Sequence, residues 1–383
     1  MNKRISWIDN VKFFAIFCVI YGHCNGFIIN PESIKGWYFW NSLIVAFNMP
    51  LFMFISGSLS SGSFRNLNNI RDLELFLCKN TERIGVPNLF FTFFAAGYKS
   101  LFENYKISLL LFGTLLIMAV FVFYKDRIKY GNVFYKIFIA SIIVASFFSR
   151  PAYFWFLTVL LSIVVTVGIS VYCFKKNYYW GIIGSLAIFL FCSYKFPLYQ
   201  PDMLIYYLIG LYMGYLVSST RILHWYNSLK HKYAVGGGIS LLLITLSLVL
   251  FPNIQRYNFY LFSVFDLFSM DSVHILLIRL LCGLFISVGI CILFSIICQK
   301  KTCLTYWGTR TLTLYLIHAF MLGRFRCHAF VIDSNSPYAW VNASIFAIAI
   351  LIASMIVDFI ISKSSLFSYL LFGDLKRIKA KVI

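Results

Sequence analysis

Long apolar segments recur along the whole chain, and they restrict its possible folds more than any other feature. The segments run for about 17 to 25 residues, which is long enough for a helix to cross the hydrocarbon core of a bilayer. Of the 383 residues, 61% are hydrophobic and only 12% are charged, a balance that soluble domains do not show. Backbone groups inside a bilayer must satisfy their hydrogen bonds within the segment, so such segments are helical. The sequence therefore predicts an all-α protein, a polytopic transmembrane helical bundle.

The apolar segments divide into about 10–12 spans. The expected spans lie near residues 10–29, 38–59, 87–103, 107–124, 133–149, 152–174, 178–194, 202–219, 233–251, 273–298, 303–323 and 338–361. Lys99, Glu103 and Lys136 interrupt the short runs between 87 and 149, which leaves open two true spans or a re-entrant or interfacial segment there. No stretch is long and polar enough for a separate soluble domain, so residues 1–383 are expected to form a single transmembrane domain.

The net charge of +20 comes from basic residues in the short segments between the spans. With the N-terminus in the cytoplasm, the inward segments, such as 65–83, 125–129 and 300–301, are richer in Lys and Arg than the outward ones. This asymmetry follows the positive-inside rule and predicts both termini in the cytoplasm. It indicates membrane lipids as partners and not nucleic acid. The ten Cys show neither C-x-x-C nor a His/Cys cluster at metal spacing, so no metal site is expected.

The first apolar segment carries three polar residues, Asp9, Lys12 and His23. At about 100° per residue they fall within roughly 60° of one another on one helix face, with Lys12 and His23 about 16 Å apart along the axis. The face would offer a charge at the membrane surface and a titratable imidazole deep inside, and a polar group at that depth indicates function. No small-residue cleavage site follows His23, so this segment is predicted to be a retained first helix.

Four motifs carry a resemblance to a known family. They are W-I-D-x-x-K followed by ten residues and His23, N-M-P-L-F-M-F-I-S-G at 48–57, W-F-L at 155–157 and L-Y-L-I-H at 314–318. In this order and spacing the chain resembles the acyltransferase 3 family of integral membrane O-acyltransferases, which O-acetylate cell-surface glycans. The resemblance covers most of the chain and implies ten or eleven spans.

The resemblance also implies roles for particular residues. His23 would be the catalytic general base, grouped with Asp9 of the same motif. Lys12, Lys79, Arg83 and Arg310 are assigned to the binding of the donor; the alternative is a positive-inside anchor for Lys79 and Arg83 and an interaction with lipid headgroups for Arg310. Trp155, His318, Ser56 and Tyr315 are assigned to the acceptor cavity; the alternative for His318 is a hydrogen bond to a serine on another helix. The family usually shows R-x-x-R before the third span, whereas here Asn80 stands at the first position and Lys79 lies one residue early. This departure leaves room for an altered donor, such as succinyl.

Each residue also has a purely structural interpretation. His23 would pack against a neighbouring helix, Lys12 would extend to the lipid headgroups, and Trp155 would anchor the interface. Ser56 belongs to a Ser-Gly pair that allows close helix packing, which is the favoured interpretation there. Asp9 lies about 20 Å from His23 along the helix, too far to orient the imidazole, and is expected to pair with Lys12 or a nearby basic residue.

The resulting hypothesis is a membrane O-acyltransferase that uses acyl-CoA, with acetyl-CoA as the expected donor. The acceptor implied by the resemblance is a hydroxyl of a cell-surface polysaccharide or lipid-linked sugar, and the implied location is a bacterial inner membrane. The alternative is a secondary transporter or flippase of a glycan or small molecule. That class predicts inverted repeats with paired interrupted helices, which the sequence does not show. The oligomeric state is left open.

Overall fold

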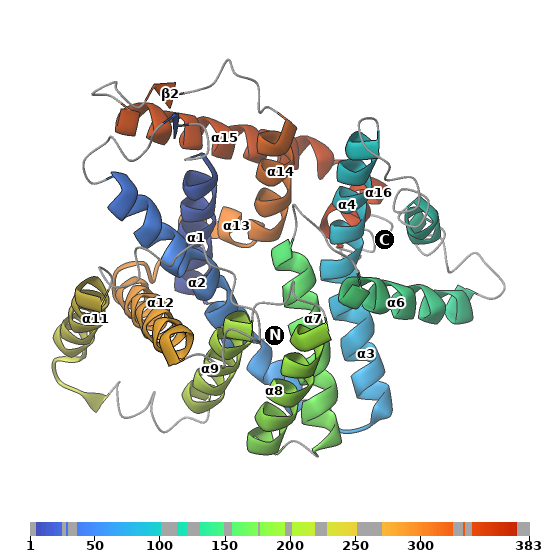
Figure 1. The fold of residues 1–383 in the computed structure, drawn as a ribbon, viewed down its shortest axis with the longest axis horizontal. Helices are drawn as coiled ribbons and strands as arrows, with labels where there is room; N and C mark the ends of the chain where they lie inside the picture. Colours follow the sequence, from blue (N-terminus) through green and yellow to red (C-terminus); the bar gives the residue numbers. More distant parts are fainter. Residues whose placement is uncertain are drawn as a thin grey trace. The chain divides into compact units, whose positions relative to one another are not determined.

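The computed structural model describes residues 5–24, 28–29, 37–100, 113–120, 131–148, 155–174, 177–195, 201–218, 228–250, 270–324, 332–333 and 339–373. Within these ranges the regular structure is helical apart from two short strands, which confirms the predicted all-α class. The strands are β1 (Ile28–Ile29) and β2 (Ile332–Asp333), and they pair in parallel. The helices are shown in Figure 1.

The chain divides into two compact units, and each is built from segments far apart in sequence. Unit 1 comprises Met1–Ser63, Gln200–Tyr315 and Arg324–Ala353, and unit 2 comprises Phe64–Tyr199, Leu316–Gly323 and Ser354–Ile383. The boundary between the units falls within α14 and α15. The expected single domain over residues 1–383 stays a prediction.

Unit 1 holds the first helix of the chain. Its helices are α1 (Ser6–Cys24), most of α2 (Trp37–Arg65), α9 (Pro201–Ser218), α11 (Lys232–Leu250), α12 (Met270–Ile297), α13 (Cys303–Gly308) and the first parts of α14 (Thr311–Arg324) and α15 (Ala339–Ile361). Figure 1 shows α11 beside α12 and α13 beside α1. The ring of Phe14 in α1 is stacked on that of Phe47 in α2, with 6.4 Å between the ring centroids, and it is tilted against the ring of Phe294 in α12, with 5.5 Å between the centroids. Aromatic contacts therefore join these helices.

Helices α2 and α9 cross at glycines. Gly57 abuts the α9 backbone at Tyr207, and Gly210 of α9 abuts the α2 backbone at Phe54. Ser58 Oγ donates to the Gly210 carbonyl at 2.9 Å across the same crossing. Small residues let helix backbones approach this closely. The contact therefore supports the packing interpretation of the Ser56-Gly57 pair.

The central helix of unit 2 is α7 (Trp155–Cys173), in which 83% of the residues from Phe156 to Cys173 are buried. The other helices are α3 (Ile70–Asn80), the π-helical turn Thr81–Gly85, α4 (Val86–Ser100), α6 (Gly131–Phe148), α8 (Tyr178–Lys195), α16 (Ser365–Phe372) and the remainders of α14 and α15. Asn88 of α4 donates to Thr158 of α7 at 2.9 Å in the interior, so the buried polar groups of this unit are hydrogen-bonded partly to one another.

Among the described residues, five helices are long and apolar enough to cross a bilayer. They are Leu43–Arg65, Phe156–Cys173, Lys232–Val249, Leu277–Ile297 and Val341–Ile361. Shorter apolar helices are Val133–Val144, Met203–Leu216 and Thr311–Leu322. This composition makes the chain an integral membrane protein. The total of 10–12 spans and the cytoplasmic position of both termini stay predictions.

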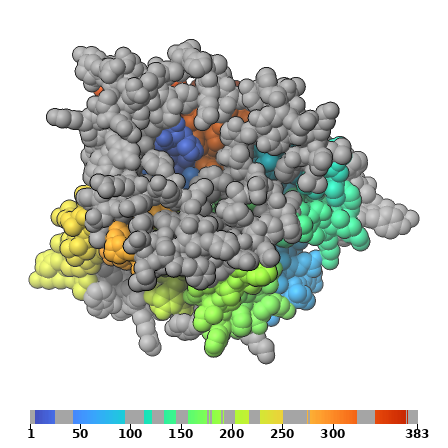
Figure 2. All heavy atoms as spheres, viewed as in Figure 1, coloured from blue at the N-terminus to red at the C-terminus, as the bar shows by residue number. Residues whose placement is uncertain are grey.

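The exposed face of α11 is largely apolar, as contact with lipid requires. Lys232–Val249 in α11 is only 17% buried. Its exposed side chains include Leu241, Leu242 and Val249. Figure 2 shows α11 in yellow on the surface of the molecule. A soluble protein would bury such residues, whereas a bilayer covers them.

Two predicted spans need correction. The span expected at 10–29 corresponds to α1, which ends at Cys24 and is followed by β1. The span expected at 303–323 is two helices, because the chain turns at Thr309 and Arg310 between α13 and α14. Helices α3 and α16 were expected as inter-span and tail segments.

Candidate functional site

Helix α1 runs without a break from Ser6 to Cys24 and positions all three polar residues of the first motif. Near its start, the Asp9 carboxylate lies 3.6 Å from Lys12 Nζ, with Asp9 buried and Lys12 partly exposed. The predicted pairing of Asp9 with Lys12 is therefore confirmed. Residues three apart on a helix meet in this way, and the pair holds the lysine ammonium at the helix start.

The short helix α13 is fixed against the start of α1 by Asn10. The Asn10 amide donates to the Cys298 carbonyl at 3.0 Å, and its oxygen accepts from the hydroxyls of Thr302 at 3.2 Å and Thr305 at 2.9 Å. Thr302 also caps α13, and its backbone N–H donates to Thr305 Oγ1 at 2.9 Å. One buried amide thus ties the end of α12 and the start of α13 to α1.

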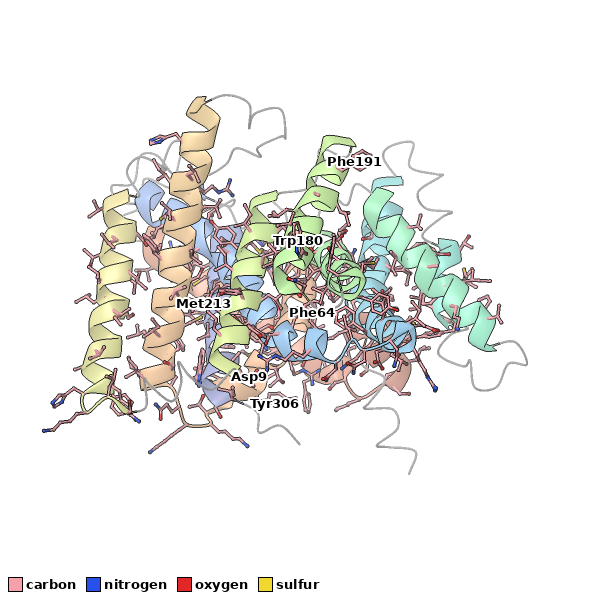
Figure 3. The ribbon with its side chains drawn as sticks, turned by 90° about the horizontal axis from the view of Figure 1, so that it is seen from below. Asp9, Phe64, Trp180, Phe191, Met213 and Tyr306 are labelled. Carbon is pink, nitrogen blue, oxygen red and sulfur yellow. The ribbon has the colours of Figure 1, made fainter. Side chains whose placement is uncertain are left out.

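The other end of α13 approaches α1 even more closely. Gly308 abuts the backbone carbonyl of Asp9, and a Cβ at this position would overlap that oxygen. Arg310 follows two residues later and is buried; its Nη1 donates to the Tyr306 hydroxyl at 3.2 Å, and its guanidinium lies 5.7 Å from the Tyr306 ring. Figure 3 shows Asp9 and Tyr306 at the same end of unit 1.

Two of the four predicted donor-binding residues, Lys12 and Arg310, therefore belong to segments that meet near the start of α1. Asp9 connects them, because its carboxylate pairs with Lys12 and its backbone contacts Gly308. A buried guanidinium and a partly exposed ammonium, fixed beside one helix end, form an arrangement suited to an anionic ligand.

Removing the Asn10 side chain should loosen this arrangement. We expect Asn10→Ala to lower the free energy of unfolding by about 1–3 kcal/mol, because the Thr302 and Thr305 hydroxyls would lose a buried acceptor. Thermal unfolding of the detergent-solubilised protein measures the effect. Asn66→Ala is the matched control, since Asn66 is exposed, and it should leave the melting temperature unchanged. Equal stability of the two variants would contradict the structural role of Asn10.

His23 lies at the opposite end of α1, in the last turn, and its side chain is exposed. The depth of this imidazole within the membrane stays a prediction. Neighbouring groups come from two helices: Gly22 faces Asn48 and Ile44 of α2, and the Tyr21 hydroxyl hydrogen-bonds to Ser344 of α15. The last turn of α1 therefore lies at a junction with α2 and α15.

The acceptor residues predicted in unit 1 have contrasting surroundings. Tyr315 in α14 is buried. The Ser56 carbonyl accepts from Ser60 Oγ at 2.7 Å, and Ser60 Oγ in turn accepts from the Tyr207 hydroxyl at 2.9 Å. Ser56 thus stands next to a hydroxyl chain that joins α2 to α9.

The remaining predicted residues lie in unit 2. Lys79 is an exposed residue in the last turn of α3, and Arg83 is an exposed residue of the π-helical turn. Trp155 is the first residue of α7. His318 lies in α14 and is completely buried. Within the described ranges no group of three His, Cys, Asp or Glu side chains could hold a metal ion.

Sequence reasoning did not identify Asn10, Asn48 or Glu82. Asn10 and Asn48 stand inside the quoted motifs, so their position was a usable signal. Glu82 is buried within the π-helical turn, where the sequence suggested only a charged segment. A carboxylate between Thr81 and Arg83 gives no local indication that it faces the interior.

Fold and site together define a class of protein. It is an α-helical integral membrane protein with polar residues at one end of its first helix and a histidine at the other. The chain belongs to the acyltransferase 3 family, because the family model for this acyltransferase domain matches residues 5–363. It is accordingly a membrane acyltransferase. Comparison with characterised proteins and with solved structures gives no match.

Proposed function

We propose that the protein transfers an acyl group, acetyl in the first instance, from acyl-CoA to a hydroxyl of a cell-surface polysaccharide or lipid-linked sugar in a bacterial inner membrane. The observation that carries this proposal is the layout of α1 in a chain of this family. One unbroken helix carries the Asp9–Lys12 ion pair near its start and a histidine in its last turn. A donor with phosphates at one end and a thioester at the other suits this layout.

The donor would bind through its phosphates at the start of α1. Lys12 and Arg310 supply the positive charges there, and Asn10 and Gly308 hold α13 in place beside them. An extended pantetheine arm would then follow the helix for the about 16 Å that separates Lys12 from His23. Lys79 and Arg83 of unit 2 are proposed as further donor contacts.

His23 would act as the general base. Its neutral imidazole accepts the proton of the acceptor hydroxyl while the oxygen attacks the thioester carbonyl. The C–S bond then breaks, coenzyme A leaves as the thiolate, and the proton on the imidazole returns to the sulfur. Asp9 serves this reaction indirectly, by holding Lys12. Trp155, His318, Ser56 and Tyr315 are proposed to line the acceptor cavity.

The proposal is tested with membrane vesicles that contain the natural glycan and labelled acetyl-CoA. Label should enter the glycan or a lipid-linked sugar only in vesicles that carry the protein. No labelling would overturn acetyl transfer, and movement of unmodified glycan across the membrane in the same vesicles would establish a flippase instead.

Replacing Lys12 by a neutral residue should weaken the binding of acyl-CoA without removing the proposed general base, His23. We expect Lys12→Met to raise the KM for acetyl-CoA about tenfold, with kcat changed less, because one charge-assisted contact to a phosphate is lost. Lys300→Met is the matched control, since Lys300 is an exposed lysine beyond the end of α12. An unchanged KM in the Lys12 variant would remove this residue from donor binding.

A further inference from the structure

The π-helical turn Thr81–Gly85 interrupts a helix that otherwise continues from α3 into α4. A π turn holds one residue more than an α turn, is rare, and is found frequently at functional sites. Pro87 gives a local reason for it: proline lacks the N–H that a regular helix would use, and its ring crowds the carbonyl four residues back, at Arg83. The sequence thus favours a wide turn at this point.

Glu82 points from this turn into the interior of unit 2 and is only 7% exposed. The Tyr135 hydroxyl of α6 forms a hydrogen bond with the Glu82 carboxylate. The fully buried Tyr369 of α16 is close enough to interact electrostatically with the same carboxylate. A carboxylate is costly to bury unless hydrogen bonds compensate it. The Glu82 side chain therefore joins the turn to its neighbouring helices.

The C-terminal end of α16 contacts the backbone of the same turn. Gly373 caps α16 with a φ of 60° and donates its N–H to the Tyr369 carbonyl at 2.8 Å. It abuts the carbonyl of Glu82, and a Cβ on it would lie 2.6 Å from the Arg83 Cα. The left-handed cap favours glycine, and the close approach requires it. Side chain and backbone contacts thus fix this turn from two directions.

The exposed residues on either side of Glu82 are the two cations Lys79 and Arg83. They are four residues apart, and residues at this spacing lie on the same side of a helix, about one turn apart. Arg83 belongs to the π-helical turn and Lys79 to the last turn of α3, so the conformation of the π-helical turn sets where Arg83 lies relative to Lys79.

We propose that Glu82 is a positioning residue that anchors the wide turn to α6 and α16, so that Lys79 and Arg83 form one two-cation site for the phosphates of the acyl donor. The inference rests on the proposed function, because that function supplies the anionic ligand. Glu82 acts through the two cations and does not touch the donor.

Kinetics in the labelled-vesicle assay test this role. We expect Glu82→Ala to raise the KM for acetyl-CoA about tenfold, while kcat changes by less than about twofold. Glu82→Gln should stay close to the native KM, because its amide oxygen still accepts from Tyr135. The matched control is Glu74→Gln: Glu74 lies on α3 and forms an exposed ion pair with Lys136 at 2.8 Å, so its loss should leave KM unchanged.

A double-mutant cycle separates positioning from general stability. If Glu82 acts through the cations, Lys79→Met should raise KM in the native chain but add little in the Glu82→Ala chain. Additive effects would overturn the inference. Tyr135→Phe removes only the hydroxyl and should raise KM in the same direction, which keeps the test decisive if Glu82→Ala fails to fold.

The outcomes for the two proposals are distinguishable. If the native chain transfers no label from acetyl-CoA, the proposed function fails. If the native chain transfers label and the Lys79 and Arg83 variants raise KM, but Glu82→Ala and Tyr135→Phe do not, only the positioning role of Glu82 is overturned.

Discussion

Replacing His23 by Ala should reduce the rate of acyl transfer about 100- to 10,000-fold, the range by which a positioned general base accelerates proton transfer. The KM for acetyl-CoA should change little, because Lys12 and Arg310 lie at the opposite end of α1. The decrease should therefore appear in kcat. Labelled acetyl-CoA and membrane vesicles with matched amounts of native and variant protein provide the measurement.

The control for this prediction is a histidine outside the proposed site. His231 is exposed just before α11, and His231→Ala should transfer label at the native rate. Equal labelling by the native chain and His23→Ala would remove His23 from the chemistry. His318, which is completely buried in α14, would then be the residue to test next.

Much of the helical architecture could be predicted because a bilayer imposes a simple length and composition on each span. The expected limits 178–194, 202–219 and 338–361 agree with α8, α9 and α15 to within one residue at each end. Local amphipathic signals were harder to use. The capping box of Asn69 and Asp72 starts α3, but the charged residues around it made the segment resemble an inter-span loop.

The break at Arg310 could not be predicted from periodicity, because apolar residues continue on both sides of it. For the candidate site, the ion pair of Asp9 and Lys12 was predictable, since residues three apart are neighbours on a helix surface and these two carry opposite charges. The bonds from Asn10 to Thr302 and Thr305 join residues 292 and 295 positions apart, and only the folded chain brings them together. The burial of Glu82 likewise depends on contacts with residues distant in sequence, Tyr135 and Gly373.

Placing a methyl group at Gly308 should separate α13 from α1. A Cβ at this position overlaps the Asp9 carbonyl oxygen, which belongs to helix backbone and cannot rotate away. We expect Gly308→Ala to lower the free energy of unfolding by about 1–3 kcal/mol, the range for overpacking in a tightly packed interior. Gly308→Val should cost more. Thermal unfolding in detergent measures both.

The same substitution should also weaken donor binding in whatever protein still folds. Arg310 follows Gly308 by two residues, so a displaced α13 moves the guanidinium relative to Lys12, and the KM for acetyl-CoA should rise about tenfold or more. Gly237→Ala is the matched control: nothing lies within 4 Å of a Cβ at Gly237 in α11, and alanine favours a helix more than glycine does. That variant should be as stable as the native chain or slightly more so. If Gly308→Ala matches Gly237→Ala in both stability and KM, α13 does not hold Arg310 beside α1 in the working protein, and the donor site must be sought around Lys79 and Arg83 alone.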